Sequence, residues 1–182
     1  AQTATAFAEA LRDEGRHVLL LVDSITRFAR AQREVGLAAG EPPARRGYPP
    51  SVFAALPKLV ERAGTSARGA ITAIYTVLVE GSDLDEPIAD EVRGTLDGHI
   101  LLERHLAARG HYPPIDIVHS LSRVASTLMT AEQLRMAERL RRATALDESK
   151  RELVSLGAYV KGSEPALDRV IVHRDAIERF LR

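Results

Sequence analysis

The chain has no cysteine and no tryptophan, and only 4% of its 182 residues are aromatic. Without cysteine there is neither a disulfide framework nor a thiolate metal site, which fits a reducing compartment. Neither sign of charge is in excess, because 25 Lys and Arg residues balance 25 Asp and Glu residues, so no large basic surface for nucleic acid is expected. The longest aliphatic run, residues 18–22, is far shorter than the ~20 residues that cross a bilayer, and no signal-peptide pattern opens the chain. These absences favour an ordinary soluble, cytoplasmic protein.

The pattern of apolar residues predicts strands that alternate with helices up to about residue 128. The aliphatic strand 17–22 is expected to be buried on both faces, as in parallel sheets. Gly and Pro interrupt regular structure over residues 36–50, and an acidic loop covers residues 80–87. Because helices separate the strands, we expect parallel pairing with right-handed crossovers. The remaining predicted elements are helices at 25–37, 51–63 and 88–96, and strands at 69–79, 99–102 and 115–118.

Near Thr130 the predicted secondary structure changes from strands alternating with helices to helices alone. Thr130 can cap a helix that reaches about residue 144, and Asp147 can cap a second helix that runs to about residue 156. Residues 157–165 interrupt, and a last, mostly helical stretch covers residues 166–181. We therefore predict two domains, an α/β part over residues 1–128 and a small C-terminal helical domain over residues 129–182.

An acid follows the first predicted strand directly. Asp23 comes after the aliphatic run, which places its carboxylate at the carboxyl edge of a parallel sheet. Open α/β sheets bind ligands at this edge, and nucleotide hydrolases hold the magnesium of a nucleotide there. An isolated acid in this position can equally cap the following helix, because side-chain capping and the helix dipole both favour it. The strand and its acid alone leave both interpretations open.

Longer motifs around this acid favour the nucleotide interpretation. The segment DSITRFARAQRE (residues 23–34) resembles the one after the magnesium-coordinating strand in hexameric motors related to the rotary ATPases. The segment GEPPARRGYPPSVF (residues 40–53) is similar to the export ATPases of type III secretion and flagellar systems, and residues 76–81, 85–90 and 96–100 continue this resemblance. It covers essentially the whole chain. It implies an α/β fold with a partial, mostly parallel P-loop (RecA-like) sheet, and a catalytic role for Asp23 through the magnesium of ATP.

Two more residues acquire roles through the resemblance. Tyr112 precedes two prolines that stiffen the backbone, and its motif resembles the one that supplies the adenine-stacking tyrosine of rotary catalytic subunits. By itself Tyr112 would be interpreted as a tyrosine packed where a loop meets the core. Arg123 matches the position of the family's arginine finger, a catalytic residue that offsets phosphoryl charge from the neighbouring subunit. Elsewhere such an arginine would be assigned to a surface ion pair.

Two parts of a complete nucleotide site do not occur in these residues. There is no Gly-x-x-x-x-Gly-Lys-Ser/Thr motif, so the backbone cradle for the phosphates is missing. The family's general-base glutamate also belongs to a segment that the resemblance places upstream. Residues 1–16 have the pattern of an amphipathic helix already under way, which Gly15 ends. We therefore expect a C-terminal part of a longer ATPase that hydrolyses little ATP on its own.

The resemblance implies a homohexamer that uses ATP and magnesium to release chaperones and unfold cargo for type III secretion. It would surround a central stalk protein and associate peripherally with the secretion apparatus, in the cytoplasm at the inner-membrane base, with no nucleic-acid partner. Residues 78–81 and 90–93 favour the virulence-type branch over a flagellar export ATPase. An RNA-translocating transcription terminator shares the Asp-Ser-Ile-Thr-Arg block, but residues 47–53 and 157–162 speak against it. A non-catalytic ring or scaffold subunit is the remaining alternative.

Several charged residues carry weaker signals. The acids at positions 83, 85, 86, 90 and 91 lie around the start of a predicted helix, where its dipole favours carboxylates, so we expect solvated acids rather than metal ligands. The six histidines show no paired ligand spacing. By the resemblance, Arg45 and Arg46 would face the pore of the ring. A basic cluster is interpreted either as a solvated face or, by the resemblance, as a contact for cargo or chaperones; it comprises Arg135, Arg139, Arg141 and Arg142.

Overall fold

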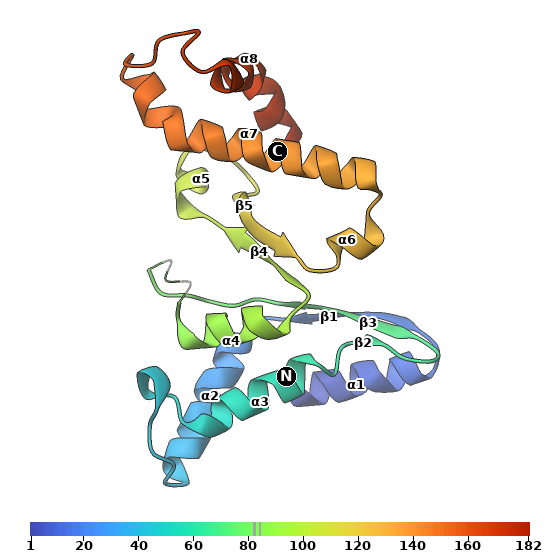
Figure 1. Cartoon of the computed structure of the whole chain (residues 1–182). Helices are drawn as coiled ribbons and strands as arrows, with labels where there is room; N and C mark the ends of the chain where they lie inside the picture. Colours follow the sequence, from blue (N-terminus) through green and yellow to red (C-terminus); the bar gives the residue numbers. More distant parts are fainter. Residues whose placement is uncertain (82, 84) are drawn as a thin grey trace. The chain divides into compact units, whose positions relative to one another are not determined.

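The computed structural model describes residues 1–81, 83 and 85–182, and in it the chain forms two compact units, Ala1–Leu96 and Asp97–Arg182. Figure 1 shows their helices and strands along the chain. Residues 82 and 84 of the expected acidic loop lie outside the described residues. The two-domain division at residues 128 and 129 stays a prediction, because compactness places the strands of residues 98–122 with the C-terminal helices.

The first unit is built on a three-stranded sheet in the order β1-β3-β2. β3 pairs in parallel with β1, from His17 opposite Ala70 to Val22 opposite Tyr75, and antiparallel with β2. Five of the helices and strands agree with the predicted positions to within about two or three residues. In chain order the elements are α1 (Gln2–Asp13), β1 (His17–Val22), α2 (Ile25–Ala38), the short η1 (Arg45–Gly47), α3 (Pro50–Val60), β2 (Gly64–Thr65), β3 (Ala70–Tyr75) and α4 (Pro87–Thr95).

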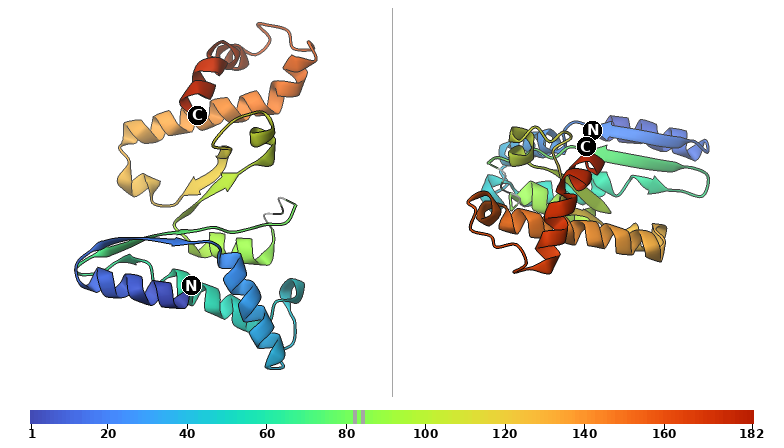
Figure 2. Two further views of the ribbon diagram at one scale, coloured as in Figure 1. Left: turned by 180° about the vertical axis from the view of Figure 1, so that it is seen from behind. Right: turned by 90° about the horizontal axis from the view of Figure 1, so that it is seen from above.

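Helices α1 and α3 lie on the same side of this sheet, as both Figure 1 and the reverse view in Figure 2 show. Leu20 and Ile71 are buried in a cluster with Ala8 of α1. Leu19 and Leu21, which point to the opposite face, are 61% and 66% exposed. The prediction that β1 is buried on both faces is therefore wrong for this chain, because alternate side chains of a strand point to opposite faces and only one face is covered.

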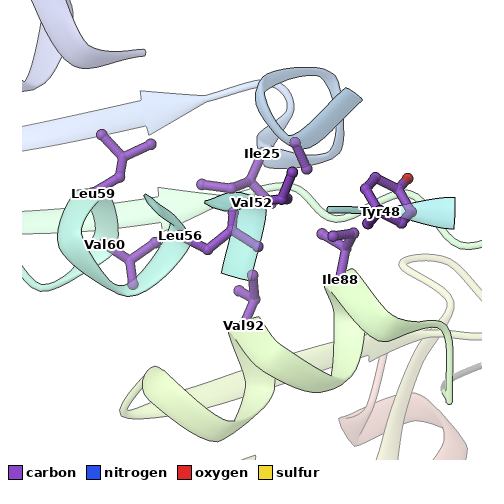
Figure 3. Packing of buried hydrophobic residues seen from close by; sticks show 9 residues of the cluster. Ile25, Tyr48, Val52, Leu56, Leu59, Val60, Ile88 and Val92 are labelled. Carbon is purple, nitrogen blue, oxygen red and sulfur yellow. The ribbon is translucent and has the colours of Figure 1, made fainter. Parts of the chain in front are cut away.

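The main core lies between α2, α3 and α4 (Figure 3). Val52, Leu56 and Val60 recur every four residues and so form one stripe of α3. They pack with Ile25 at the start of α2 and with Ile88 of α4, both of which are fully buried. The core thereby fixes the start of α2, which follows the candidate acid Asp23 directly.

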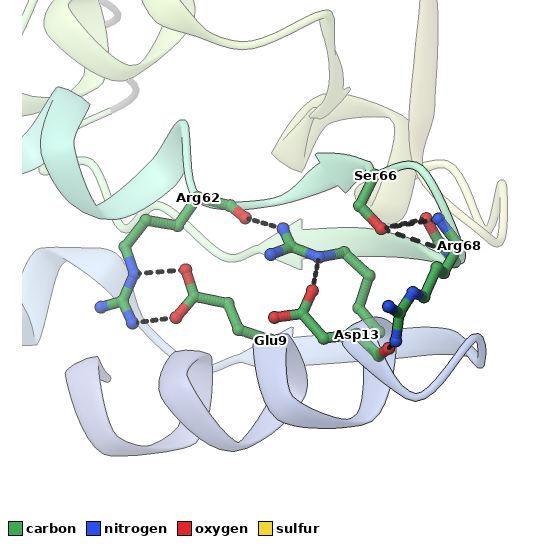
Figure 4. A network of polar contacts seen from close by, with 7 residues as sticks. Glu9, Asp13, Arg62, Ser66 and Arg68 are labelled. Atoms are coloured by element: carbon green, nitrogen blue, oxygen red, sulfur yellow. Dashed lines mark hydrogen bonds and ion pairs between the residues drawn. The ribbon is translucent and has the colours of Figure 1, made fainter.

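A polar network ties α1 to the end of α3 (Figure 4). The carboxylate of Glu9 accepts two hydrogen bonds from the guanidinium of Arg62, at 2.9 and 2.5 Å, and this lowers the pKa of Glu9. Arg12 donates to the backbone carbonyl of Arg62 over 3.3 Å. Near this network, a Cβ atom on Gly69 would lie 2.4 Å from the carbonyl oxygen of Arg16, so the backbones of α1's end and β3 approach too closely for any side chain at residue 69.

The second unit combines a hairpin with two long helices. Its elements are β4 (Gly98–Leu102), α5 (Arg104–Ala108), β5 (Ile115–Ser122), α6 (Ala125–Leu128), α7 (Ala131–Ser155) and α8 (Pro165–Phe180). β4 and β5 pair antiparallel, with Gly98 opposite Ser122 and Leu102 opposite Ile115. The expectation of parallel pairing fails here because the connection holds only the five-residue α5 and a proline turn, after which the chain doubles back. The predicted α/β class with a helical C-terminal part is confirmed.

Asp116 is a buried acid on β5. Its carboxylate accepts hydrogen bonds from the backbone amides of Val118 (2.8 Å) and His119 (2.9 Å) and contacts Nδ1 of His119 at 2.7 Å. Burial favours the neutral carboxyl group, but these hydrogen bonds outweigh it and lower the pKa of Asp116. The hydrogen bond to Asp116 in turn raises the pKa of His119.

One continuous helix, α7, replaces the two helices predicted over residues 130–156. Its start is as predicted: the Thr130 hydroxyl accepts from the amide of Gln133, whose side chain accepts from the amide of Thr130. The predicted second start at Asp147 is wrong, because its carboxylate binds Arg151 and Arg174 instead of capping backbone amides. Within residues 1–81, 83 and 85–182, none of the helices has the length and hydrophobicity that a membrane-spanning helix needs.

Candidate functional site

Strands β1 and β3 end side by side, and polar residues follow both. Since Val22 lies opposite Tyr75, Asp23 and Thr76 are the first residues beyond the strands at one edge of the sheet. The amide of Thr76 donates to the carbonyl of Val22 over 3.0 Å, and its hydroxyl donates to Oδ1 of Asp23 over 2.6 Å. Asp23 is exposed, so this edge presents a solvent-accessible carboxylate in an orientation that Thr76 fixes. The strand pattern predicted the position of Asp23 correctly.

The start of α2 is anchored to the segment after β3. The amide of Ile25 donates to the carbonyl of Thr76 over 3.0 Å. The buried hydroxyl of Thr26 accepts from the amide of Leu78 at 2.9 Å and donates to its carbonyl at 3.4 Å. Ser24 is the N-cap of α2, and its hydroxyl accepts from the amide of Arg27. The cap position is therefore filled by Ser24, and Asp23 is not needed for it.

The surroundings of Asp23 suit an indirect magnesium ligand. No described residue donates a hydrogen bond to its second oxygen, Oδ2, while Oδ1 is held by Thr76. Within the described residues, no group of three or more His, Asp or Glu side chains gathers closely enough to bind a metal ion by itself. Magnesium usually keeps several waters and binds through one or two carboxylates together with substrate phosphates. A single oriented carboxylate fits that requirement, although its role as a magnesium ligand stays a prediction.

Tyr112 lies on a stiff turn in the second unit. The turn is closed by two hydrogen bonds, from the amide of His111 to the carbonyl of Leu106 (3.0 Å) and from the amide of Glu103 to the carbonyl of Pro114 (2.9 Å). The Tyr112–Pro113 peptide bond is cis. The side chain of Tyr112 is 62% exposed, so it is not the loop–core tyrosine that it would be if taken alone. An exposed ring on a rigid turn can stack on a flat ligand.

Arg123 follows β5 in the same unit. Its amide donates to the carbonyl of Asp97 over 2.7 Å, which fixes the backbone where β5 ends, and the residue is exposed. An arginine finger must be exposed on its own subunit to reach the site of another, and Arg123 meets that condition. Asp23 lies in the first unit and Tyr112 and Arg123 in the second, so neither unit by itself brings all three together.

Thr76 is the functional candidate that the sequence analysis did not single out. It lies within the motif at residues 76–81, but a lone threonine after a strand carries no chemical signal. Its significance comes from the parallel register, which joins residues 53 positions apart in the sequence.

The arginines of the Pro- and Gly-rich loop are engaged within the first unit. Arg46 lies 2.6 Å from a carboxylate oxygen of Asp83, and this ion pair lowers the pKa of Asp83. Arg45 binds Asp90 at 3.4 Å and stacks over the ring of Phe53 at 5.3 Å. The acids before and within α4 therefore hold this loop in place, and Glu86 caps α4. Whether the loop faces a pore stays a prediction.

Comparison with known proteins supplies the context for these residues. The family model of the ATP synthase alpha/beta family, nucleotide-binding domain, matches residues 1–122. The model of the T3SS EscN ATPase C-terminal domain matches residues 129–182.

Curated relatives carry two kinds of name. A flagellum-specific ATP synthase of Treponema pallidum is 57% identical over 181 residues, covering 100% of this chain and 40% of the relative. A type 3 secretion system ATPase of Pseudomonas syringae pv. tomato is 54% identical, covering 99% of this chain and 40% of the relative. The chain thus spans about two fifths of the length of these relatives.

Solved structures agree in fold. The assembled ATPase EscN from the type III secretion system of enteropathogenic E. coli has a TM-score of 0.95 and 50% identity, over 99% of this chain and 44% of that one. EscN in complex with its central stalk EscO gives a TM-score of 0.88 over 99% of this chain and 43% of that one.

Proposed function

The chain belongs to the ATP synthase alpha/beta family. We propose that it provides the sheet edge that carries Asp23, and the C-terminal domain, of an ATPase that energises protein export through a type III secretion apparatus. The oriented carboxylate of Asp23 is the observation that carries this proposal. Tyr112 precedes β5 and Arg123 follows it. Both residues are exposed and lie on fixed backbone, which supports the proposal.

Each of the three residues has a defined task. Asp23 would hold the magnesium of ATP indirectly, and Thr76 keeps the carboxylate of Asp23 in one orientation. When bound, magnesium offsets the negative charge of the phosphates. Tyr112 stacks on the adenine, and Arg123 acts from the adjacent subunit as the arginine finger, where a guanidinium stabilises the charge that spreads over the transferring phosphoryl group. These 182 residues contain no Gly-x-x-x-x-Gly-Lys-Ser/Thr motif, so this chain alone should show no appreciable ATPase turnover.

The proposed assembly is a homohexamer around a central stalk protein, in the cytoplasm at the inner-membrane base of the secretion apparatus. EscN is assembled and also forms a complex with its central stalk EscO, which supports the proposed oligomer and stalk. We place the domain boundary at residues 128 and 129, which the match of the C-terminal family model to residues 129–182 supports. The C-terminal domain is proposed to meet export chaperones and their cargo.

The proposal can be tested in a chimera in which residues 1–182 replace the matching 181 residues of the Treponema pallidum relative. Asp23→Ala should reduce magnesium-dependent ATP hydrolysis by about 100-fold or more, because the metal loses its protein ligand. Glu132→Ala, which removes an exposed acid far along the chain, is the matched control and should leave the rate within about twofold. Unchanged hydrolysis in the Asp23 variant would refute the assignment.

The arginine finger has its own test in the same chimera. Arg123→Ala should abolish most hydrolysis, by about 10³-fold. Mixing this variant with a variant of the phosphate-binding lysine should restore activity, because some interfaces then combine an intact loop with an intact Arg123. Mixed rings that stay inactive would contradict action across an interface.

The secretion branch is a separate question, since relatives of both kinds are more than half identical to the chain. We propose the virulence-type branch. Residues 1–182 placed in the type 3 secretion system ATPase of Pseudomonas syringae should therefore restore export in a strain without that ATPase, and residues 1–182 placed in the Treponema pallidum relative should not restore export in a strain without its flagellar ATPase. The reverse result would assign the chain to flagellar export.

A further inference from the structure

An open groove lies between helices α7 and α8. Helix α8 passes across α7, as Figure 1 and the view from above in Figure 2 show. The groove has a volume of about 680 Å³. Its floor is apolar and consists of Leu140 and Leu146 from α7 together with Val170 and Ile177 from α8. Met136, which is largely exposed, lines it as well and offers a deformable apolar contact.

Within the part of the chain that the structure describes, the lining of this groove contains three arginines and one histidine and no acidic residue. Arg139 and Arg142 belong to α7, and Arg169 and His173 belong to α8. Arg142 is paired with the exposed Glu138 one turn away. Arg139 and Arg169 have no carboxylate within ion-pair distance among the described residues. The groove therefore combines an apolar floor with uncompensated positive charge on both walls.

We propose that this α7–α8 groove binds an acidic amphipathic helix of a partner protein. An apolar floor between two helices accepts the apolar side chains that an amphipathic helix presents at positions i, i+3, i+4 and i+7. Acidic residues beside those anchors meet Arg139 and Arg169, which form bidentate hydrogen bonds with carboxylates. A basic helix would be rejected by like charge, so the walls select for the sign of charge as well as for shape.

This inference deepens the proposed function by naming a partner surface on the export ATPase, and it rests on that function only for the source of the partner. The groove lies wholly within residues 136–177, so ATP hydrolysis is not needed to test it. A failure of the binding test would leave the assignment of Asp23 intact, and a failure of the ATPase test would leave the groove intact.

The test uses the whole 182-residue chain and a fluorescein-labelled, helix-forming peptide of about 14 residues, which spans about 21 Å as a helix. The peptide carries Leu at i, i+3, i+4 and i+7 and Glu at its exposed positions, and a second peptide carries Lys in place of Glu. Fluorescence anisotropy should show saturable binding of the Glu peptide and none of the Lys peptide. Equal affinity for both peptides, or no binding of the Glu peptide, would overturn the proposal.

Two double variants locate the binding. Arg139→Glu with Arg169→Glu should weaken binding of the Glu peptide by about tenfold or more, because two attractive pairs become repulsive. Arg135→Glu with Arg141→Glu makes the same change of charge on exposed residues of α7 outside the groove lining, and it should change affinity by less than about twofold. Equal weakening by both variants would show non-specific attraction and refute the groove. Circular dichroism checks that helix content is retained.

The same variants distinguish a protein partner from a lipid surface. Vesicles of phosphatidylglycerol also carry negative charge but present no helical row of apolar anchors. If the chain sediments with these vesicles through Arg139 and Arg169 while the Glu peptide does not bind, the groove serves a membrane surface and the proposal is wrong.

Discussion

Replacing Asp147 by alanine is expected to loosen the packing of α8 on α7. Asp147 is 6% exposed in the middle of α7. Its Oδ2 accepts from Nη2 of Arg151 at 2.8 Å, and its Oδ1 accepts from Nε and Nη2 of Arg174 on α8 at 2.9 and 2.5 Å. One carboxylate therefore joins two cationic side chains from two helices, and without it the two guanidinium groups face each other.

The size of the effect follows from the burial of the three groups. Removing one partner of a buried ion pair costs about 3–5 kcal/mol, because the remaining charge is left without compensation. The side chains of Arg151 and Arg174 are 32% and 26% exposed, so water can reach them in part, and Glu178 remains 3.5 Å from Arg151. We therefore expect the lower end of the range, about 3 kcal/mol, which corresponds to about 100-fold in an opening equilibrium.

Native-state hydrogen exchange of the α7 and α8 amides measures this quantity locally. Asp147→Ala should lower their protection by about two orders of magnitude. Glu138→Ala is the matched control on the same helix, since Glu138 forms an exposed ion pair with Arg142, and it should lower protection by only about twofold. Similar small effects in both variants would refute the reasoning. Replacing the triad together, by Asp147→Leu, Arg151→Met and Arg174→Met, should recover most of the loss if uncompensated charge is its cause.

Three further predictions concern stability. The contact between Asp116 and His119 should contribute most to stability between about pH 4 and 6.5, and this contribution should be lost as pH falls through the lowered pKa of Asp116 or rises through the raised pKa of His119. In urea unfolding across pH, His119→Asn should remove the loss of stability on the alkaline side, and an unchanged pH profile would contradict this. Gly69→Ala should destabilise the first unit by about 1–3 kcal/mol, because its Cβ meets backbone, whereas Gly94→Ala, with nothing within 4 Å, should not. If Gly69→Ala does not change thermal unfolding, the backbone at Gly69 is not in tight contact with its neighbours. Thr26→Val should cost about 1 kcal/mol by removing both hydrogen bonds to Leu78, while Thr26→Ser should retain them, and equal urea midpoints for the two variants would count against this anchor.

Local patterns in the sequence were sufficient for the first strand and its acid. An unbroken aliphatic run followed by Asp23 can be recognised within six residues, and the helix start at Thr130 is encoded by Thr130 and Gln133 together. These features depend on neighbours in the chain. The roles of Tyr112 and Arg123 came from family resemblance and stay predictions, although both residues are exposed as those roles require.

Features that depend on distant residues could not be predicted. Asp147 follows the local rule for a helix cap, but Arg174, 27 positions away, supplies its partner and lets α7 continue. Thr76 became part of the site only through the register of β1 and β3. The burial of β1 was overestimated, because a run of aliphatic residues does not show whether other elements cover one face of the strand or both. For β4 and β5, the short connection outweighed the general rule that helices between strands imply parallel pairing.

The unbroken course of α7 has a mechanical consequence. A helix of 25 residues is about 37 Å long, and α7 is helical from Ala131 to Ser155 without interruption. A pull on a ligand held between α7 and α8 would therefore travel along the whole rod to the turn before Thr130 and to β5, which contacts α7. Because α7 contacts both α8 and β5, a displacement on the α8 side would be passed to β5 within the same unit.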